Sequence, residues 1–135
     1  MSEISAAVTR VFAGRSDVDA VVLFGSAARG RQRADSDIDI YVRLRHQARW
    51  TLRQRLDLAA ELSAVLRREV DLIVEDETTS VILRREVANC GLPLYESRPG
   101  AWIGLRAAAS LAYADLEPYL RRIGGAVRAR AKAHG

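Results

Sequence analysis

The sequence predicts a single α/β (α+β) domain, in which helices flank a mixed four-stranded sheet and a C-terminal helix follows. Three observations lead to this prediction. The chain has 135 residues, which is the size of one domain. Helical and strand-like hydrophobic patterns succeed one another along it. The strand-like segments 18–24 and 37–44 follow each other too closely for a long helical crossover, so the sheet must be mixed.

The first three predicted elements are a helix and two strands. Apolar residues at helical spacing indicate a helix over 3–13, and Gly14 is suited to end it. The β-branched, apolar run 18–24 is typical of a buried strand. Residues 37–44 alternate strictly, so one face of this strand points into the core. The other face is too charged for ordinary packing, and it carries Asp37, Asp39, Tyr41 and Arg43.

The next four elements complete the sheet. A leucine pattern predicts a long helix over about 50–68, and 70–74 forms a strand that is buried except for its one carboxylate, Asp71. A further helix from about 81 ends near Asn89, where Gly91 is a good cap. The short strand 92–95 lies at a sheet edge because it contains Pro93.

After a linker at 97–100, the last segment is predicted to be a helix with a long apolar stripe. Its spacing alternates between three and four residues, as in a coiled-coil seam. Pro118 should kink or restart this helix, and Gly124-Gly125 should end it. The stripe packs either on the chain's own helices or on a partner; it consists of Trp102, Leu105, Ala109, Ala112, Leu116, Tyr119 and Ile123.

Composition excludes several classes of protein. A hydrophobic fraction of 49% with 28% charged residues excludes a disordered chain. No stretch approaches the roughly 20 apolar residues of a membrane helix, and the N-terminal residues do not resemble a secretory signal. Cys90 is the only cysteine, so an internal disulfide and a Cys-based zinc site are excluded. We therefore expect a cytoplasmic protein without a membrane partner.

The charge distribution favours an anionic ligand or partner. The net charge is +4, eight arginines lie within 29–55, and the segment 121–135 carries five basic residues and no acid. Such patches suit a nucleotide, a nucleic acid or an acidic protein surface. Direct nucleic-acid binding is not expected, because the chain lacks a helix-turn-helix signature and has few aromatic residues to stack on bases.

The segment 24–39 contains the candidate site. Gly25 follows a buried strand and precedes a predicted helical turn, an arrangement in which backbone N–H groups and the Ser26 hydroxyl can bind phosphate. Asp37 and Asp39 project from one strand face and repel each other unless a cation lies between them. Such oxygen ligands suit Mg²⁺, and a metal shared with Asp71 would neutralise that third carboxylate.

This pattern resembles a known family. Gly25-Ser26, ten further residues and then Asp37-Ile38-Asp39 are similar to the signature of the nucleotidyltransferase superfamily that includes DNA polymerase β. The run around the signature and the ending 91–96 resemble its smallest branch, the minimal nucleotidyltransferases (MNT), many of which are antitoxins paired with a HEPN-domain toxin. The resemblance implies a polymerase β-like nucleotidyltransferase fold over 1–98, with 99–135 as a helical extension and basic tail of the same domain.

The resemblance also implies a mechanism. Two Mg²⁺ ions would bind Asp37 and Asp39, and one of them also Asp71, while Gly25 and Ser26 hold the phosphates of ATP. An acceptor hydroxyl, deprotonated near Asp71, would attack the α-phosphate and pyrophosphate would leave. Arg29 and Arg33 would either make further contacts with the triphosphate or remain solvated loop residues. Arg43 would bind the triphosphate or pair with an Asp.

We expect the acceptor to be a tyrosine of a cognate HEPN RNase toxin, bound in a heteromeric complex and silenced by AMP. Two alternatives remain open. The chain could modify a small molecule such as an aminoglycoside, although relatives of that kind carry an additional domain. It could also neutralise the toxin by binding alone, through its C-terminal helix and basic tail.

Overall fold

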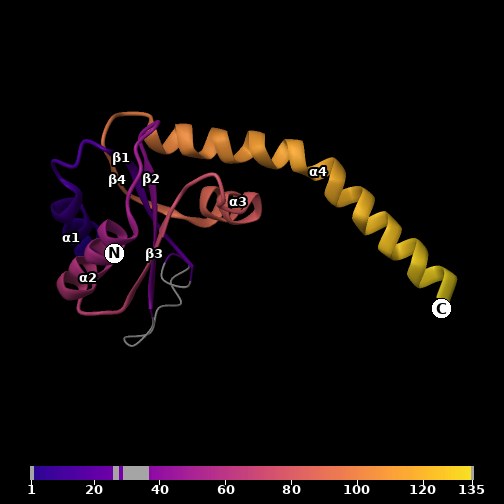
Figure 1. The fold of residues 1–135 in the computed structure, drawn as a ribbon, viewed down its shortest axis with the longest axis horizontal. Coiled ribbons are helices and arrows are strands. Elements are labelled where there is room, and N and C mark those ends of the chain that lie inside the picture. The colour runs from indigo at the N-terminus through magenta and orange to yellow at the C-terminus, as the bar shows by residue number, and fades with distance from the viewer. Residues whose placement is uncertain (1, 26–27, 29–36, 135) are drawn as a thin grey trace.

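The fold is known from a computed structural model that describes residues 2–25, 28 and 37–134. Four strands form one sheet in the order β3–β2–β1–β4 (Figure 1). β2 is antiparallel to β1 and parallel to β3, and β4 is antiparallel to β1. The predicted mixed sheet and the edge position of the Pro93 strand are both confirmed. The strands are β1 (Val18–Phe24), β2 (Ile38–Leu44), β3 (Val70–Val74) and β4 (Leu92–Glu96).

Two helices cover each face of the sheet. α1 (Ser2–Phe12) and α2 (Leu52–Leu66) lie on one face, and α3 (Val81–Cys90) and α4 (Ala101–His134) lie on the other (Figure 1). The bounds of α1, α2 and α3 agree with the sequence prediction to within two residues. No helix in the described part of the chain is both long enough and apolar enough to cross a membrane.

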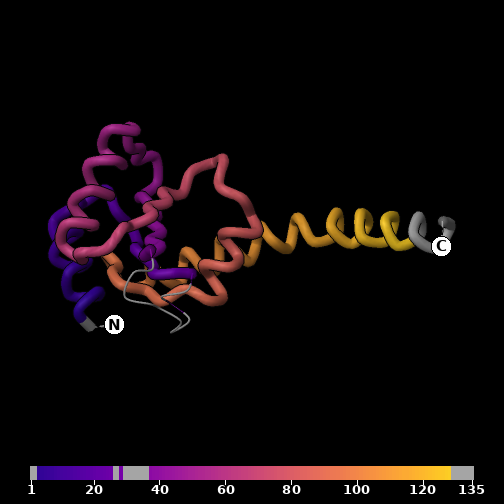
Figure 2. The backbone as a smooth tube through the Cα atoms, turned by 90° about the horizontal axis from the view of Figure 1, so that it is seen from below, coloured from indigo at the N-terminus to yellow at the C-terminus, as the bar shows by residue number. Residues whose placement is uncertain are grey.

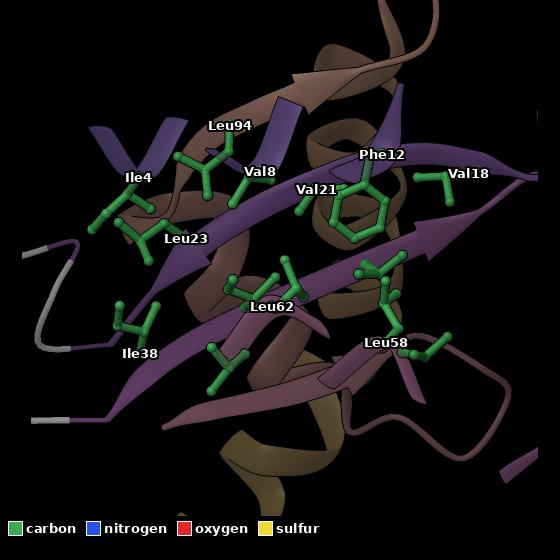
Figure 3. Packing of buried hydrophobic residues seen from close by; sticks show 14 of the residues in the cluster. Ile4, Val8, Phe12, Val18, Val21, Leu23, Ile38, Leu58, Leu62 and Leu94 are labelled. Atoms are coloured by element: carbon green, nitrogen blue, oxygen red, sulfur yellow. The ribbon is translucent and has the colours of Figure 1, made fainter. Parts of the chain in front are cut away.

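The larger core lies between the sheet and the pair α1 and α2. Ile4, Val8 and Phe12 of α1 meet alternate residues of β1 and β2, and Leu58 and Leu62 of α2 close the cluster (Figure 3). This is the face on which the strict alternation of β2 predicted apolar side chains. Thr51 positions α2, because its hydroxyl accepts from the Gln54 N–H at 3.1 Å while the Gln54 side chain accepts from the Thr51 N–H at 2.7 Å.

A second core lies under α3 and α4. Val22 of β1, Tyr41 of β2, Val87 of α3 and Leu105 of α4 are all buried in it. The expectation that this face of β2 is too charged for packing is therefore wrong at Tyr41. Its ring is fully buried, and its hydroxyl donates to Glu75 Oε1 at 2.6 Å, which satisfies the one polar group of the side chain.

α4 differs most from its prediction. It was expected to end at Gly124-Gly125, yet it continues to His134 with Pro118 inside it. Its first half lies against the body, where Ala101, Leu105 and Ala109 are buried. Its second half extends away from the body, and Figure 1 shows a bend midway along the helix; Figure 2 shows the same extension from below. Two adjacent glycines weaken a helix without ending it.

Candidate functional site

Two of the predicted carboxylates lie side by side on neighbouring strands. Asp39 of β2 and Asp71 of β3 are direct partners in the parallel register, so their backbones lie one strand spacing apart. Asp39 alternates with Ile38 and Ile40, which face α1 and α2; its side chain therefore emerges on the α3 and α4 face. Asp37 lies exposed, one residue before β2 begins. The structure thus brings all three carboxylates to one end of β2 and β3.

Burial and repulsion act together on Asp39. Partial burial is the main cause that raises the pKa of its carboxyl above the usual value, and the neighbouring charges of Asp71 and then Asp37 raise it further. A bound cation would offset both the cost of burying the Asp39 carboxylate and its repulsion by Asp71 and Asp37. Asp71 is exposed, because β3 is an edge strand, which agrees with the expectation that its carboxylate is the unburied part of this strand. The expectation that Asp71 is a costly buried charge in need of a partner is wrong.

Gly25 packs directly against this carboxylate. It follows β1 immediately, and Phe24 is the register partner of Asp39. Its φ of +74° lies in the left-handed region, and a Cβ at this position would overlap Asp39 Oδ2 and lie 3.2 Å from Asp39 Cγ. Only glycine allows the backbone after β1 and the carboxylate of β2 to approach so closely. Ser26, Arg29 and Arg33, the other predicted nucleotide contacts, lie outside the described residues.

The donor set fits a hard divalent cation that is shared with a substrate. Within the described ranges, no three His, Cys, Asp or Glu side chains are already arranged around a metal position. Mg²⁺ does not require such a cage, since it usually takes one or two carboxylates together with waters and substrate phosphates. Asp39 and Asp71 supply the paired carboxylates, and the missing side chain of Gly25 lets the backbone after β1 pack directly against Asp39.

Sequence reasoning missed a polar network farther along the same face. Glu75 accepts from the Tyr41 hydroxyl and forms an ion pair with Arg43, whose Nε lies 3.3 Å from Glu75 Oε2. Of the two roles predicted for Arg43, the structure supports pairing with an acid, but that acid is Glu75 and not an Asp. The alternation of β3 could have identified this partner, because residues 71, 73 and 75 fall on one side of an extended chain.

A cavity of about 540 Å³ lies at the opposite end of the sheet from Gly25. It opens beside Asp19 near the start of β1, and Arg98, Arg43 and Glu75 also line it. Four of its charged side chains form two ion pairs, since Arg98 Nε lies 3.1 Å from Asp19 Oδ1 and Arg43 pairs with Glu75. The carboxylate site and this cavity are therefore separate features.

Comparisons with known proteins agree with this geometry. The family model described as "Polymerase beta, Nucleotidyltransferase" matches residues 7–99, which include Gly25 and all three carboxylates. No curated protein matches the chain.

Several solved structures share the fold. A toxin–antitoxin structure with AMP-PNP has a TM-score of 0.75 and 23% identity, over 92% of this chain and 98% of that chain. A structure of the toxin–antitoxin pair MntA-HepT has a TM-score of 0.71 and 20% identity, over 95% and 99%. A complex of a tri-AMPylated HEPN toxin from Shewanella oneidensis with its MNT antitoxin has a TM-score of 0.71 and 20% identity, over 94% and 98%. At these identities, the likeness establishes the common fold.

Proposed function

Because the chain belongs to the polymerase beta nucleotidyltransferase family, we propose that it is an antitoxin that transfers AMP from ATP to a tyrosine hydroxyl of a HEPN-domain RNase toxin and thereby neutralises it. The observation that carries this proposal is the register pair Asp39 and Asp71 with Gly25 packed against it. The toxin–antitoxin structures support it, because one of them holds an ATP analogue and another a tri-AMPylated HEPN toxin.

The nucleotide would lie at the end of β1. Gly25 brings the backbone after β1 directly against the Asp39 carboxylate. The backbone N–H groups that follow and the hydroxyl of Ser26 would donate to the β- and γ-phosphates beside it. Arg29 and Arg33 would reach the triphosphate from the following segment. Guanidinium groups suit this role because they bind phosphate oxygens in pairs.

The three carboxylates would hold the metal. Asp37 and Asp39 would bind two Mg²⁺ ions, and Asp71 would join them at one of these. When bound, Mg²⁺ offsets the charge of the triphosphate and stabilises the attacking and leaving oxygens. The raised pKa of the Asp39 carboxyl supports this assignment, since its causes are burial and like charges that a cation would offset.

The transfer itself is a substitution at phosphorus. The tyrosine oxygen forms a bond to the α-phosphorus, the bond from that phosphorus to the bridging oxygen breaks, and pyrophosphate leaves with the bonding electrons. The phenolic proton passes to Asp71, whose exposed carboxylate on the edge strand an acceptor can reach. Positioning of the two substrates supplies most of the remaining acceleration.

We assign the transfer chemistry to residues 1–98 and treat 99–135 as a helical extension of the same domain. The family match over 7–99 supports this division, as does the burial of Ala101 and Leu105 against the body. The reaction takes place in the cytoplasm, in a heteromeric complex of the chain with its toxin. A protein acceptor is favoured over a small molecule because one of the similar structures contains a tri-AMPylated HEPN toxin.

Mass spectrometry tests the proposal. The cognate HEPN toxin is incubated with ATP, Mg²⁺ and either the native chain or Asp37→Ala/Asp39→Ala, and an aminoglycoside serves as a competing acceptor. We expect AMP on a toxin tyrosine with the native chain and none with the variant. An unmodified toxin that both chains silence equally would instead establish neutralisation by binding alone, and AMP on the aminoglycoside would establish the small-molecule reaction.

A further inference from the structure

The second half of α4 extends away from the body, and none of the other helices and strands of the described residues covers it. Tyr113 of α4 still contacts the body, because the guanidinium of Arg85 stacks 3.9 Å from its ring centroid. Beyond it, Arg121 pairs with Glu117, Arg122 stacks on Tyr119 and Arg128 donates to the Gly124 carbonyl, all within the helix itself. Figure 2 shows this half standing clear of the rest of the chain.

Large apolar side chains are nevertheless exposed along it. Leu120, Ile123 and Val127 are 37%, 62% and 59% exposed, and Leu116 is half-buried. We call these four residues the distal stripe. They lie four, three and four residues apart, as in a coiled-coil seam, which buries its apolar positions against another helix.

The distal stripe continues the side of α4 that faces the body. Val127 lies 18 residues after the buried Ala109, which is five complete helical turns. A partner on the stripe would therefore lie on the same side of α4 as α3. α3 and α4 cover the face of the sheet from which Asp39 emerges (Figure 1). A protein held by the stripe would thus lie over the carboxylate face.

The positive charge of the C-terminal segment indicates which kind of partner would bind the distal stripe. Residues 121–135 carry five basic side chains and no acid. A second copy of the chain would place these like charges against each other, so self-association through the stripe is disfavoured. A helical surface with acidic residues would pack on the apolar stripe and attract the basic side chains.

We propose that the distal stripe docks an acidic helical surface of the acceptor protein and holds that protein over the sheet face that carries Asp39 and Asp71. The inference rests on the proposed function for the identity of the acceptor as the HEPN toxin. It goes further in assigning the binding energy to a segment that lies outside the residues matched by the family model.

The test compares two matched variants of the full chain. Ile123→Glu/Val127→Glu changes two residues of the distal stripe. Ile103→Glu/Leu111→Glu is the control, because these α4 side chains are similarly exposed, at 70% and 69%, but lie outside the stripe. Glu is a better helix former than Ile or Val and about as good as Leu, so neither variant should weaken α4. Affinity for the immobilised HEPN toxin is measured together with ATP binding and AMP transfer.

We expect the stripe variant to lose at least about 100-fold in toxin affinity and the control to stay within about 3-fold. ATP binding should not change in either. Transfer by the stripe variant should recover at saturating toxin, which places the defect in KM and not in kcat. The native affinity should also fall between about 0.05 and about 0.3 M salt.

Several outcomes would overturn the proposal. These are a stripe variant that binds the toxin as tightly as the control, an equal loss in both variants, and a native chain that dimerises through the stripe in sedimentation. Failure of the proposed function has a different signature. If the native chain binds the toxin through the stripe but transfers no AMP, the docking surface stands and the enzymatic role does not.

Discussion

Replacing Gly25 by alanine should separate the transfer reaction from the stability of the fold. Two demands meet at this position, a left-handed backbone with φ of +74° and direct packing against the Asp39 carboxylate. The chain offers a control for each demand. Gly14 has φ of +81° with open space around its missing side chain, and a Cβ at Gly91 would overlap Val22 and the Val87 carbonyl instead of a carboxylate.

The expected magnitudes follow from these surroundings. Alanine in the left-handed region costs about 1–2 kcal/mol, and the stiffer unfolded chain offsets part of this, so Gly14→Ala should lose roughly 1 kcal/mol of unfolding free energy. Gly25→Ala should lose a similar amount, because Asp39 lies in the partly open end of the sheet and can rotate away. That rotation moves the carboxylate by about 1 Å, and a displacement of this size at a reacting centre costs about 100-fold in rate.

The assay pairs urea unfolding with the rate of AMP transfer to the toxin. All three alanine variants should lose stability, and only Gly25→Ala should also lose about 100-fold or more in transfer. A Gly25→Ala protein that is folded and transfers AMP within about 3-fold of the native rate would refute the reasoning. An equal loss of transfer in Gly14→Ala would refute it too, because it would trace the defect to general destabilisation.

Three further predictions concern the carboxylates, the terminal helix and the metal. The raised pKa of the Asp39 carboxyl means that its negative charge destabilises the folded state. This destabilisation is absent below the usual pKa of an aspartate and grows as the pH rises through the pKa of Asp39 in the folded chain. Asp39→Asn should therefore have a higher melting temperature than the metal-free native chain at pH 8 but not at pH 4. A chain ending at Gly100 should not fold cooperatively, since it lacks the buried Leu105, whereas one ending at Ala114 should keep its melting temperature and lose toxin affinity. In calorimetry, chelation of Mg²⁺ should weaken ATP binding by the native chain and change it little in Asp37→Ala/Asp39→Ala.

The sheet was predictable because its signals are local. The β-branched run of β1 and the strict alternation of β2 need no tertiary information, and Pro93 placed β4 at an edge because proline cannot donate to a ladder. The pairing of Asp39 with Asp71 was anticipated only as a shared metal. Its direct register follows from the parallel alignment of β2 and β3, which no sequence pattern encodes.

Burial on the second face was not predictable for a related reason. Whether a strand residue is covered depends on which strands lie inside the sheet and where the helices cross it. Tyr41 lies on an inner strand and becomes fully buried, while Asp71 lies on the edge strand and stays exposed. Glu75 completes this arrangement by accepting from the Tyr41 hydroxyl, a contact between residues 34 positions apart. The polar face of β2 therefore has two parts: Asp39 near its start belongs to the candidate site, and Tyr41 in its middle is packed in the core.

The second half of α4 is helical through Gly124-Gly125 although its own sequence disfavours a helix. Pro118 and the two glycines together make this segment about 5 kcal/mol less favourable as a helix than alanine would be. Arg121, Arg122 and Arg128 make their contacts within the helix itself, and isolated helices of this length are marginal in water. A helical partner seated on the distal stripe would supply the missing packing energy. Toxin binding and ordering of the helix are then linked, so part of the interaction energy is consumed in folding the segment, and the affinity per unit of buried area is lower than for a rigid surface.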